Sequence, residues 1–469
     1  MHYMELLSQT EIETVHNATL EIMADVGLDF HHPAALDCLA AAGAKVDGRR
    51  VRFPRTLVEE RVAMAPEKFT LSARNPDHDL TVGGDATVFA PINCPAFVDD
   101  AEGGRRYGTM ADFDNLVKLT HLSRNLDLCS NIPVEPNDVD LHLRPAWTTY
   151  SCLKHTDKCF MGSSLSEVAA EQVLTMVGMV FGDIDGPAPA ARVLSIPCSL
   201  TPLSYDERTL GAMMAYARSA QPQMVNSLAI AGSTAPVTLA GTLVVQNAEV
   251  LAGLVLCQLI REGTPVVYAA ASSAMNMRTG ALLVGAPELS MNNIATAQMA
   301  RFYGLPSRGC GALTDSLCIT EQAGYESMMS LLTAHAAGIN FILHAAGALD
   351  TINCVSYEKF VLDDDLIGMV KHIRRGIQVD ETALALSAIR ETGPGGYFLD
   401  KMHTIQNCRK ALFQRQISPR RPDIQFRERE GISHIEKAAE RWRALLAGYQ
   451  APDFPASVDR DLRDWMERL

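Results

Sequence analysis

Along most of the chain, short apolar runs alternate with longer stretches in which apolar residues recur every three or four positions. Continuous runs of about four to eight apolar residues are typical of strands buried on both faces, whereas the longer spacing is typical of helices. From about residue 89 the order strand, polar loop, helix repeats. The predicted strands are Val88–Ile92, Leu126–Ile132, Lys158–Ser163, Arg192–Ser199, Gln223–Ile230, Pro265–Ala271, Pro306–Ala312 and Asn340–Ala346.

A helical pattern follows each predicted strand. The predicted helices are Ala111–Leu122, Leu141–Lys154, Glu167–Phe181, Tyr205–Ser219, Leu239–Arg261, Glu288–Tyr303, Gln322–Gly338 and Tyr357–Arg375. Strands that alternate with helices at this spacing form a parallel sheet. Eight such units favour an α/β fold of the (β/α)₈ TIM barrel type over an open doubly wound sheet.

The barrel pattern covers residues 88–378 and leaves an extension at each end. Residues 1–87 combine helices with β-hairpin signals, and the first helix, Gln9–Val26, begins with a capping box of Ser8 and Glu11. A further hairpin is expected at 95–108, with Gly103 and Gly104 at its tip. Residues 379–469 are expected to be a helical extension, with a surface linker at 418–430 and two final helices near 435–447 and 458–469.

Charge and cysteine content indicate which binding partners and which cellular compartment fit this chain. The formal net charge is −14, with acidic and basic residues mixed throughout, which argues against nucleic acid or an anionic membrane as a partner. The eleven cysteines form no CxxC pair, and many lie in apolar runs, a pattern typical of reduced thiols in the cytoplasm. The start of the chain lacks the pattern of a signal peptide. The most apolar stretches, 237–260 and 331–349, contain interior polar residues and are predicted to be buried elements, not membrane spans.

In a barrel of this type, the active site collects side chains from the carboxyl ends of the strands. Those ends carry mostly uncharged polar groups: Asn93, Cys94, Glu135, Ser163, Ser164, Ser199, Thr201, Asn226, Ser227, Ser272, Ser273, Thr314, Asp315 and His344. Only Glu135, Asp315 and His344 among them are plausible acids or bases. His344 lies in an apolar strand and can be either a core residue or a group that binds substrate.

Known motifs for metals and nucleotides are absent from the sequence. There is no His-x-His pair, and Cys94, Cys129, Cys159 and Cys310 lack the close spacing of a zinc site, so no metal is predicted. There is also no phosphate-binding glycine loop of the GxxxxGK[ST] or GxGxxG type.

Aromatic residues are few but gather near the predicted mouth of the barrel. They are Phe97, Tyr107, Tyr205, Tyr268 and Tyr357. Ring faces bind cations without any carboxylate, which suits a quaternary ammonium ligand. Each ring can equally pack against the barrel rim or beneath a loop.

Several long segments, in order along nearly the whole chain, resemble the trimethylamine methyltransferase family, including its glycine betaine methyltransferase branch. They are ARNPDHDLTVGG, DDAEGGRRYGTMADFDN, AQMARFYGLPS, LTDSLCITEQAGYE and HAAGALDTINCVSYEKFVLDDDLIGM. The resemblance implies a TIM barrel that moves a methyl group from a methylated amine to the cobalt of a separate corrinoid protein. The archaeal trimethylamine enzymes of the family carry pyrrolysine near the end of the seventh strand, and this chain has only standard residues there, Cys310 to Ser316. It therefore resembles the non-pyrrolysine branch.

A quaternary ammonium has a neutral amine as its leaving group, so Co(I) can displace it without prior activation. The expected enzyme is a corrinoid-dependent methyltransferase for glycine betaine or a related betaine. It would bind no permanent cofactor, would receive the corrinoid on a cognate partner protein, and would be a cytoplasmic homo-oligomer.

The hypothesis places Phe97, Tyr268 and Tyr357 around the ammonium, uses His344, Asn226 and Thr314 as donors to a substrate carboxylate, and gives Asp315 an orienting role. No catalytic residue is assigned. Two alternatives stay open, a zinc-dependent TIM-barrel methyltransferase or lyase and a non-catalytic betaine-binding barrel.

Overall fold

Eight parallel strands form the central sheet of the computed structural model, which describes residues 3–100, 103–184, 186, 189–414, 417 and 434–469. Their order in the sheet is β6-β19-β18-β15-β13-β11-β10-β9. The strands are β6 (Val88–Phe89), β9 (Leu128–Cys129), β10 (Cys159–Gly162), β11 (Leu194–Ser195), β13 (Gln223–Ser227), β15 (Val266–Ala270), β18 (Ser307–Cys310) and β19 (Phe341–Leu343). Each lies within the range predicted from the sequence, so the predicted set of eight strands is confirmed.

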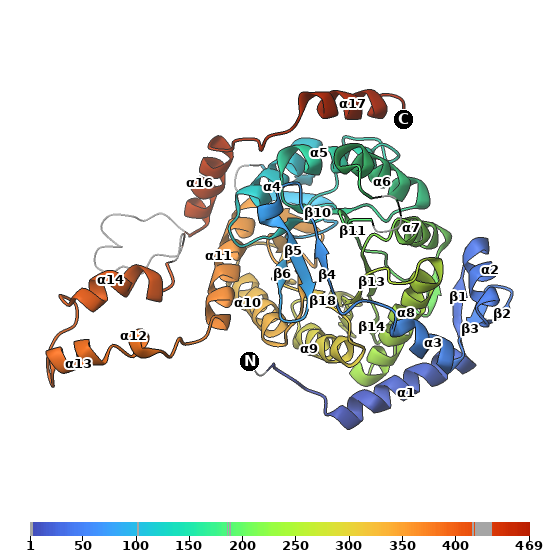
Figure 1. Ribbon diagram of the computed structural model, residues 1–469, viewed down its shortest axis with the longest axis horizontal. Helices are drawn as coiled ribbons and strands as arrows, with labels where there is room; N and C mark the ends of the chain where they lie inside the picture. The colour runs from blue at the N-terminus through green and yellow to red at the C-terminus, as the bar shows by residue number, and fades with distance from the viewer. Residues whose placement is uncertain (1–2, 101–102, 185, 187–188, 415–416, 418–433) are drawn as a thin grey trace.

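The two end strands of this order, β6 and β9, close the sheet into a ring (Figure 1). The amide of Asp127 donates to the carbonyl of Phe89 at 2.9 Å, and the amide of Phe89 donates to the Asp127 carboxylate at 2.8 Å. Further along, the amide of Cys94 donates to the carbonyl of Ile132 at 2.7 Å. The sheet is therefore a barrel, as predicted, in which side-chain and single backbone hydrogen bonds replace a regular ladder at the last junction.

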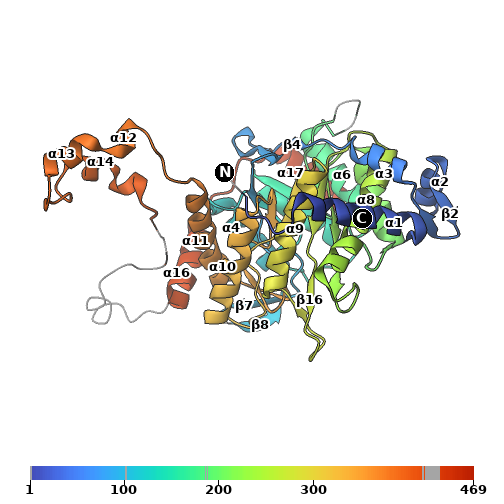
Figure 2. The same ribbon diagram turned by 90° about the horizontal axis from the view of Figure 1, so that it is seen from below.

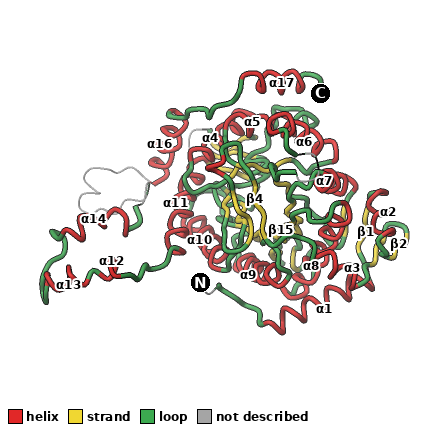
Figure 3. The backbone as a smooth tube through the Cα atoms, in the orientation of Figure 1, coloured by secondary structure: helices red, strands yellow, loops and turns green. Residues whose placement is uncertain are grey.

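One helix follows each barrel strand, and the helices surround the strand ring (Figure 3). They are α4 (Met110–Leu122), α5 (Arg144–His155), α6 (Glu167–Phe181), α7 (Glu207–Arg218), α8 (Leu239–Ile260), α9 (Pro287–Phe302), α10 (Glu321–Ala336) and α11 (Tyr357–Arg374). Side-chain caps set several of their starts. Thr109 and Asp112 form a capping box at the start of α4, and Ser166 caps α6.

A β-hairpin seals the amino end of the barrel. It consists of β4 (Lys68–Leu71) and β5 (Leu80–Gly83), joined through a short 3₁₀ turn, Pro76–His78, and it crosses the strand ring in Figure 1. Leu71 and Val82 from the hairpin pack with Val88, Leu128 and Leu194 from the barrel interior. Because apolar side chains fill this end, the chemistry must lie at the opposite, carboxyl end of the strands.

The rest of the amino-terminal extension packs against the outside of the barrel. It contains α1 (Gln9–Asp25), β1 (Leu28–Phe30), α2 (Pro33–Ala41), β2 (Lys45–Asp47), β3 (Arg50–Arg52) and α3 (Arg55–Val62). The capping box of Ser8 and Glu11 is present at the start of α1, as predicted. The extension shares one apolar core with α8, where Leu28 and Phe30 meet Leu251 and Leu254. Among the described residues, α8 is the one helix long and apolar enough to span a membrane, and most of it is buried inside the protein.

Two small sheets lie over the carboxyl end of the barrel. The first joins β20 (Ala348–Leu349), β21 (Cys354–Ser356), β7 (Phe97–Asp100) and β8 (Gly104–Tyr107). Its β7–β8 hairpin was predicted, and Gly104 has the positive φ of 60° that such a turn requires. The second joins β14 (Ile230–Ala231), β16 (Ser273–Met275) and β17 (Leu282–Leu283). A separate short strand, β12 (Ser204–Tyr205), pairs with β1 and ties the fourth strand-to-helix loop to the extension.

The carboxyl-terminal region leaves the barrel and then returns to it. The short helices α12 (Glu381–Leu384), α13 (Leu386–Thr392) and α14 (Met402–Ala411) stand away from the barrel in Figures 1 and 2. Helix α16 (His434–Ala447) packs against α11 and α4, and α17 (Ala456–Met466) packs against α5 and α6. The predicted surface linker at 418–430 lies outside the described residues.

Candidate active site

Two cysteines with solvent-accessible surface lie among the carboxyl ends of the strands. Cys94 follows β6 and Cys198 follows β11, and both keep exposed surface although the strands and loops surround them. Burial raises the pKa of both thiols, and Glu135 and Cys198 add to the effect at Cys94. Asn93 and Asn226 donate to the two sulfur atoms at 3.2 and 3.4 Å, respectively. Because both thiols are accessible although protein surrounds them, we infer a hollow at the barrel mouth, called the pocket here.

Arg308 of β18 is the main charged group beneath this hollow. It is 1% exposed, and its Nη1 donates to Oδ1 of Asn226 at 3.1 Å and to the carbonyl of Ala270 at 2.7 Å. Its Nε is buried without a partner, and no carboxylate pairs with it among the described residues. A buried guanidinium without an anion is costly, because the protein must offset the lost hydration with hydrogen bonds alone. An anionic group of a ligand could therefore pair with Arg308.

Sequence reasoning missed Arg308. Pro306–Ala312 is predicted from its apolar pattern to be a buried strand, and the candidate residues come from the carboxyl ends of the strands, whereas Arg308 lies near the start of this one. The signal was present, since Arg308 is the single charged residue in a run of small and apolar ones. A charge at such a position has to be satisfied by the fold or by a ligand.

His344 comes from the end of β19 and shares this pocket. Its Nδ1 accepts the amide proton of Asn93 at 3.2 Å, which places the ring proton on Nε2. Burial, together with the charge of Arg308, holds the pKa of His344 well below its usual value, so the ring is neutral. Its Nε2 has no partner within the described part of the chain and, unlike both ring nitrogens of His335, is not sealed from solvent. Nε2–H is therefore a free donor at the pocket.

The backbone of two pocket residues, Cys94 and His344, is in the left-handed region. His344 has φ 59° and Cys94 has φ 64°, conformations that cost a residue with a side chain on the order of 1–3 kcal/mol. The amide of Ile132 donates to Oδ1 of Asn93 at 2.9 Å and so fixes the loop that carries Cys94. Surrounding hydrogen bonds thus hold Cys94 and His344 in strained positions at the pocket.

Asn226 lies beside Cys198 and Arg308, whereas Thr314 and Asp315 have other partners. Thr314 donates its hydroxyl to Glu326 of α10 at 2.6 Å, so that proton is not available to a ligand. The Asp315 carboxylate accepts the amides of Val284 and Gly285, at 2.8 and 3.0 Å, and the hydroxyl of Thr351 at 3.1 Å. Asp315 therefore ties the loops after the sixth, seventh and eighth strands together.

The three aromatic residues expected around an ammonium do not come together. Tyr268 points out of the barrel, where its hydroxyl donates to Asn247 of α8 at 3.0 Å and its ring stacks on Tyr303. Tyr357 is the first residue of α11, where its ring stacks on Trp442 of α16 and its hydroxyl donates to Asp112 of α4 at 2.9 Å. For these two residues the prediction of a mouth position is wrong, because each ring fills the packing between strands or helices on the outer side of the barrel.

Phe97 is the one member of the predicted trio near the mouth. It lies in β7, in the small sheet over the carboxyl end, with its ring centroid 4.8 Å from that of Tyr107. The guanidinium of Arg105 lies 4.4 Å from the Phe97 ring centre and also pairs with Asp350 at 2.7 Å. In this structure, Arg105 therefore occupies a ring face that the hypothesis assigned to a ligand cation.

Two carboxylates near the mouth have structural partners. Glu135 pairs with Arg144 at 3.3 Å, and burial raises the pKa of Glu135. Glu249 of α8 accepts from the hydroxyls of Ser199, Thr201 and Ser227 and from the amide of Leu203. Burial raises the pKa of Glu249, and the four hydrogen-bond donors act in the opposite direction. Glu249 therefore anchors the loop that carries Cys198.

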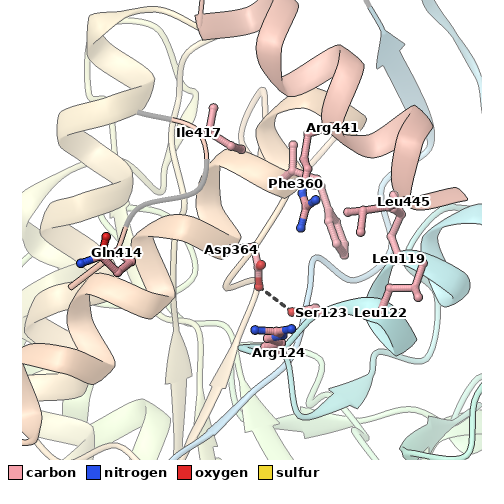
Figure 4. A pocket seen from close by; sticks show the side chains of 11 residues that line it. Leu119, Leu122, Ser123, Arg124, Phe360, Asp364, Gln414, Ile417, Arg441 and Leu445 are labelled. Atoms are coloured by element: carbon pink, nitrogen blue, oxygen red, sulfur yellow. Dashed lines mark hydrogen bonds between the residues drawn. The ribbon is translucent and has the colours of Figure 1, made fainter. Parts of the chain in front are cut away.

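Two further observations concern sites elsewhere. A pocket of about 470 Å³ lies between α4, α11 and α16, outside the strand ring (Figure 4). It is lined by Leu119, Leu122, Ser123, Arg124, Phe360, Val361, Asp364, Gln414, Ile417, Arg441 and Leu445. Its position on the outer side of the helices separates it from the carboxyl ends of the strands.

Across the described ranges, no three His, Cys, Asp or Glu side chains are grouped so that they could hold a metal ion, so the zinc alternative has no candidate ligand set there.

Comparisons with known proteins agree with this barrel. The family model of the trimethylamine methyltransferases matches residues 1–469. A glycine betaine methyltransferase of Desulfitobacterium hafniense (strain Y51) is 41% identical over 98% of this chain and 95% of its own length. A proline betaine:corrinoid methyltransferase of Eubacterium limosum is 30% identical over 96% of this chain and 95% of its own length.

Archaeal methyltransferases also match this chain. The trimethylamine methyltransferase MttB of Methanosarcina barkeri (strain Fusaro / DSM 804) is 31% identical over 86% of this chain and 83% of its own length. The solved structure of the Methanosarcina barkeri monomethylamine methyltransferase aligns with a TM-score of 0.55 at 12% identity, over 80% of this chain and 76% of that one, which supports the fold alone. The chain belongs to the trimethylamine methyltransferase family.

Proposed function

We propose that this protein transfers a methyl group from glycine betaine, or a closely related betaine, to Co(I) of a partner corrinoid protein. The observation that carries the proposal is the buried Arg308 guanidinium, which has no anionic partner among the described residues and lies with Asn226 and His344 under the hollow at the barrel mouth. A betaine carries both a carboxylate and a quaternary ammonium, so it can satisfy Arg308 while its methyl groups point outward.

The chemistry asks little of the protein beyond position. In the transfer, the methyl C–N bond breaks, its electron pair stays on the amine nitrogen, and a C–Co bond forms with the two electrons of Co(I), which becomes Co(III). The leaving dimethylamino acid is neutral at nitrogen, so no general acid is required. Arg308 and the Nε2–H of His344 would bind the carboxylate and hold the ammonium in line with the mouth. The neutral Cys94 and Cys198 thiols would line the path without adding charge.

The relatives named above support the same substrate class. Two of them act on glycine betaine and proline betaine, and these two molecules share a carboxylate and a quaternary nitrogen. The corrinoid partner is proposed on the same basis, because the Eubacterium limosum relative is described as a proline betaine:corrinoid methyltransferase. We place the protein in the cytoplasm, which fits eleven cysteines that are all unpaired.

An anaerobic methyl-transfer assay tests the proposal. Purified protein is mixed with reduced corrinoid proteins, or with free cob(I)alamin, and the absorbance change from Co(I) to methyl-Co(III) is followed with glycine betaine, proline betaine, carnitine, choline and trimethylamine. We expect transfer from one or more of the carboxylated quaternary amines and weaker or no transfer from choline. Tight binding of glycine betaine without transfer to any active acceptor would favour the non-catalytic binding barrel. Transfer from trimethylamine alone would refute the assignment to betaines.

A further inference from the structure

The segment of residues 376–412, called the arm here, stands away from the rest of the protein. It begins after α11, carries α12, α13 and α14, and lies to one side of the barrel in both views (Figures 1 and 2). Large apolar side chains on the arm are exposed along its whole length. They are Ile377, Val379, Leu384, Leu386, Ile389, Tyr397, Phe398, Leu399, Met402, Ile405 and Leu412.

The arm lacks the internal contacts that would make its helices stable. Its three helices have 4, 7 and 10 residues, whereas isolated helices shorter than about 12–15 residues are marginal in water. Ala388 is the only buried residue in these three described helices. No described element packs extensively against any of them. Helices of this kind form when a neighbouring surface covers their apolar side chains.

From these observations we propose that the arm docks on a second copy of this chain. The charge favours this occupant. The arm holds four acidic residues (Asp380, Glu381, Glu391, Asp400) and four basic ones (Arg390, Lys401, Arg409, Lys410), so it is neutral although the whole chain has a net charge of −14. A neutral arm lets two strongly acidic molecules meet without adding to their repulsion.

The size and position of the arm also fit a second copy. Its 37 residues exceed the roughly 20–30 residues that each partner contributes to a stable interface. The arm leaves from the carboxyl-terminal end of α11, at the level of the hairpin that seals the amino end of the barrel, away from the β7–β8 and β16 hairpins at the mouth (Figure 2). The arm is therefore poorly placed for a protein that must reach the mouth. Two copies that exchange arms would form a closed, two-fold symmetric dimer.

The oligomeric state of the full-length protein tests this proposal independently of its activity. Sedimentation equilibrium is measured between about 1 and 50 µM for the wild type and for the double variant Leu386→Asp with Ile389→Asp, which places charge on α13. We expect the wild type to be a dimer or a larger even oligomer and the variant to fall to a lower state. Met291→Asp, at a similarly exposed apolar residue on α9, is the matched control and should keep the wild-type state.

A second pair and a second readout guard against a folding defect. Met402→Asp with Ile405→Asp on α14 should have the same effect, and the melting temperature of the barrel should stay within about 2 °C of the wild type in both double variants. Hydrogen exchange at 381–411 should be slow at 50 µM and at least tenfold faster at 1 µM or in either variant. A monomeric wild type, or folded arm variants that associate as the wild type does, would overturn the proposal.

Discussion

At the scale of single residues, the pocket is distinctive for one unpaired cation. Arg308 is 1% exposed, and its described hydrogen bonds go to neutral oxygens of Asn226 and Ala270. In a pocket for an uncharged amine, a buried unpaired guanidinium would contribute nothing to substrate binding and would lower the stability of the protein. In a pocket for a betaine, the same group contributes binding free energy each time the carboxylate arrives.

Replacing Arg308 therefore has opposite effects on binding and on stability. A hydrogen bond to a charged group contributes about 1.5–3 kcal/mol, so Arg308→Gln should raise the KM for glycine betaine by roughly 10- to 150-fold. The melting temperature of the free protein should stay the same or rise, because a buried unpaired charge has been removed. Arg308→Lys keeps the charge but loses the planar fork, and its KM should fall between the two.

Choline serves as the internal control, because it has the quaternary head group and no carboxylate. Its inhibition constant as a competing ligand should change by less than about threefold in Arg308→Gln. An equal loss of affinity for choline and glycine betaine would mean that the substitution disturbs the pocket as a whole, and would count against a specific contact between Arg308 and the carboxylate.

The residues of the pocket were harder to predict than the strands that hold them. Asn226 and His344 can be proposed from the sequence because they lie near the carboxyl ends of buried strands. Tyr268 was misplaced because its strand, VVYAA, is buried on both faces, so no alternation of polar and apolar residues indicates which side chains point inward. The inward positions depend on the register with β13 and β18, which only the fold reveals.

At the scale of elements, the sequence predicted the barrel well because each strand and helix carries a local signal. Apolar runs marked all eight strands, and α6 matched its predicted bounds, Glu167–Phe181. Contacts between distant segments carried no such signal. The sheet at the carboxyl end pairs Phe97 with Cys354, more than 250 positions apart, and the closure of the barrel depends on the side chain of Asp127. These pairings follow from the three-dimensional arrangement and not from local pattern.

Helix α10 contains a buried histidine that makes stability depend on pH. Both ring nitrogens of His335 are buried without a partner, and burial, with the charges of Arg374 and Lys371, lowers its pKa to about 4. The same imidazole in the unfolded chain would bind a proton near pH 6.5, so between about pH 6.5 and pH 4 the native state binds fewer protons than the unfolded chain. Above about pH 6.5, His335 therefore does not lower the free energy of unfolding. As the pH falls from 6.5 towards 4, His335 lowers this free energy, by about 2 kcal/mol at pH 5.

Replacing His335 should remove this acid sensitivity. We expect His335→Leu to raise the unfolding free energy, measured in urea, by about 2 kcal/mol more at pH 5 than at pH 8. The variant also removes two unpaired buried nitrogens, which should give some stabilisation at pH 8 as well. His142→Leu, at an exposed histidine, is the control and should show no such difference. If the two pH values give the same change for His335→Leu, the native state does not exclude the proton as inferred.

At the scale of the whole molecule, exposed apolar side chains gather at the carboxyl end of the barrel. Each of the first seven connections from a barrel strand to its helix carries one: Tyr107, Leu141, Leu165, Leu200, Val237, Met277 and Leu317. They are called the rim here. In the described part of 88–372, no large apolar residue that is exposed lies on a connection from a helix to the next strand. We expect the rim to bind another macromolecule, because exposed apolar side chains that gather at one end of a protein are typical of such sites.

The rim surrounds the mouth through which the methyl group has to leave, so it is the surface that a corrinoid protein would contact. Met277 and Leu317 lie on neighbouring loops, which Asp315 ties together, and both are 67% exposed. Charge at these two positions should disturb docking of a protein while leaving the pocket below unchanged. The double variant Met277→Asp with Leu317→Asp should lower kcat/KM for a corrinoid protein that accepts methyl groups from the wild type, by at least tenfold.

Free cob(I)alamin provides the discriminating comparison, because it needs access to the mouth but makes no protein interface. Its rate of methylation by the rim variant should stay within about twofold of the wild type, as should the KM for glycine betaine. The arm variant Leu386→Asp with Ile389→Asp introduces the same charge on the other side of the molecule and should retain transfer to the corrinoid protein. Equal losses with free and protein-bound acceptor would place the defect in the pocket, and unchanged transfer to the corrinoid protein would show that docking occurs elsewhere. Because the rim and the arm lie at opposite ends of the barrel, the two variants together separate docking of the corrinoid protein from self-association.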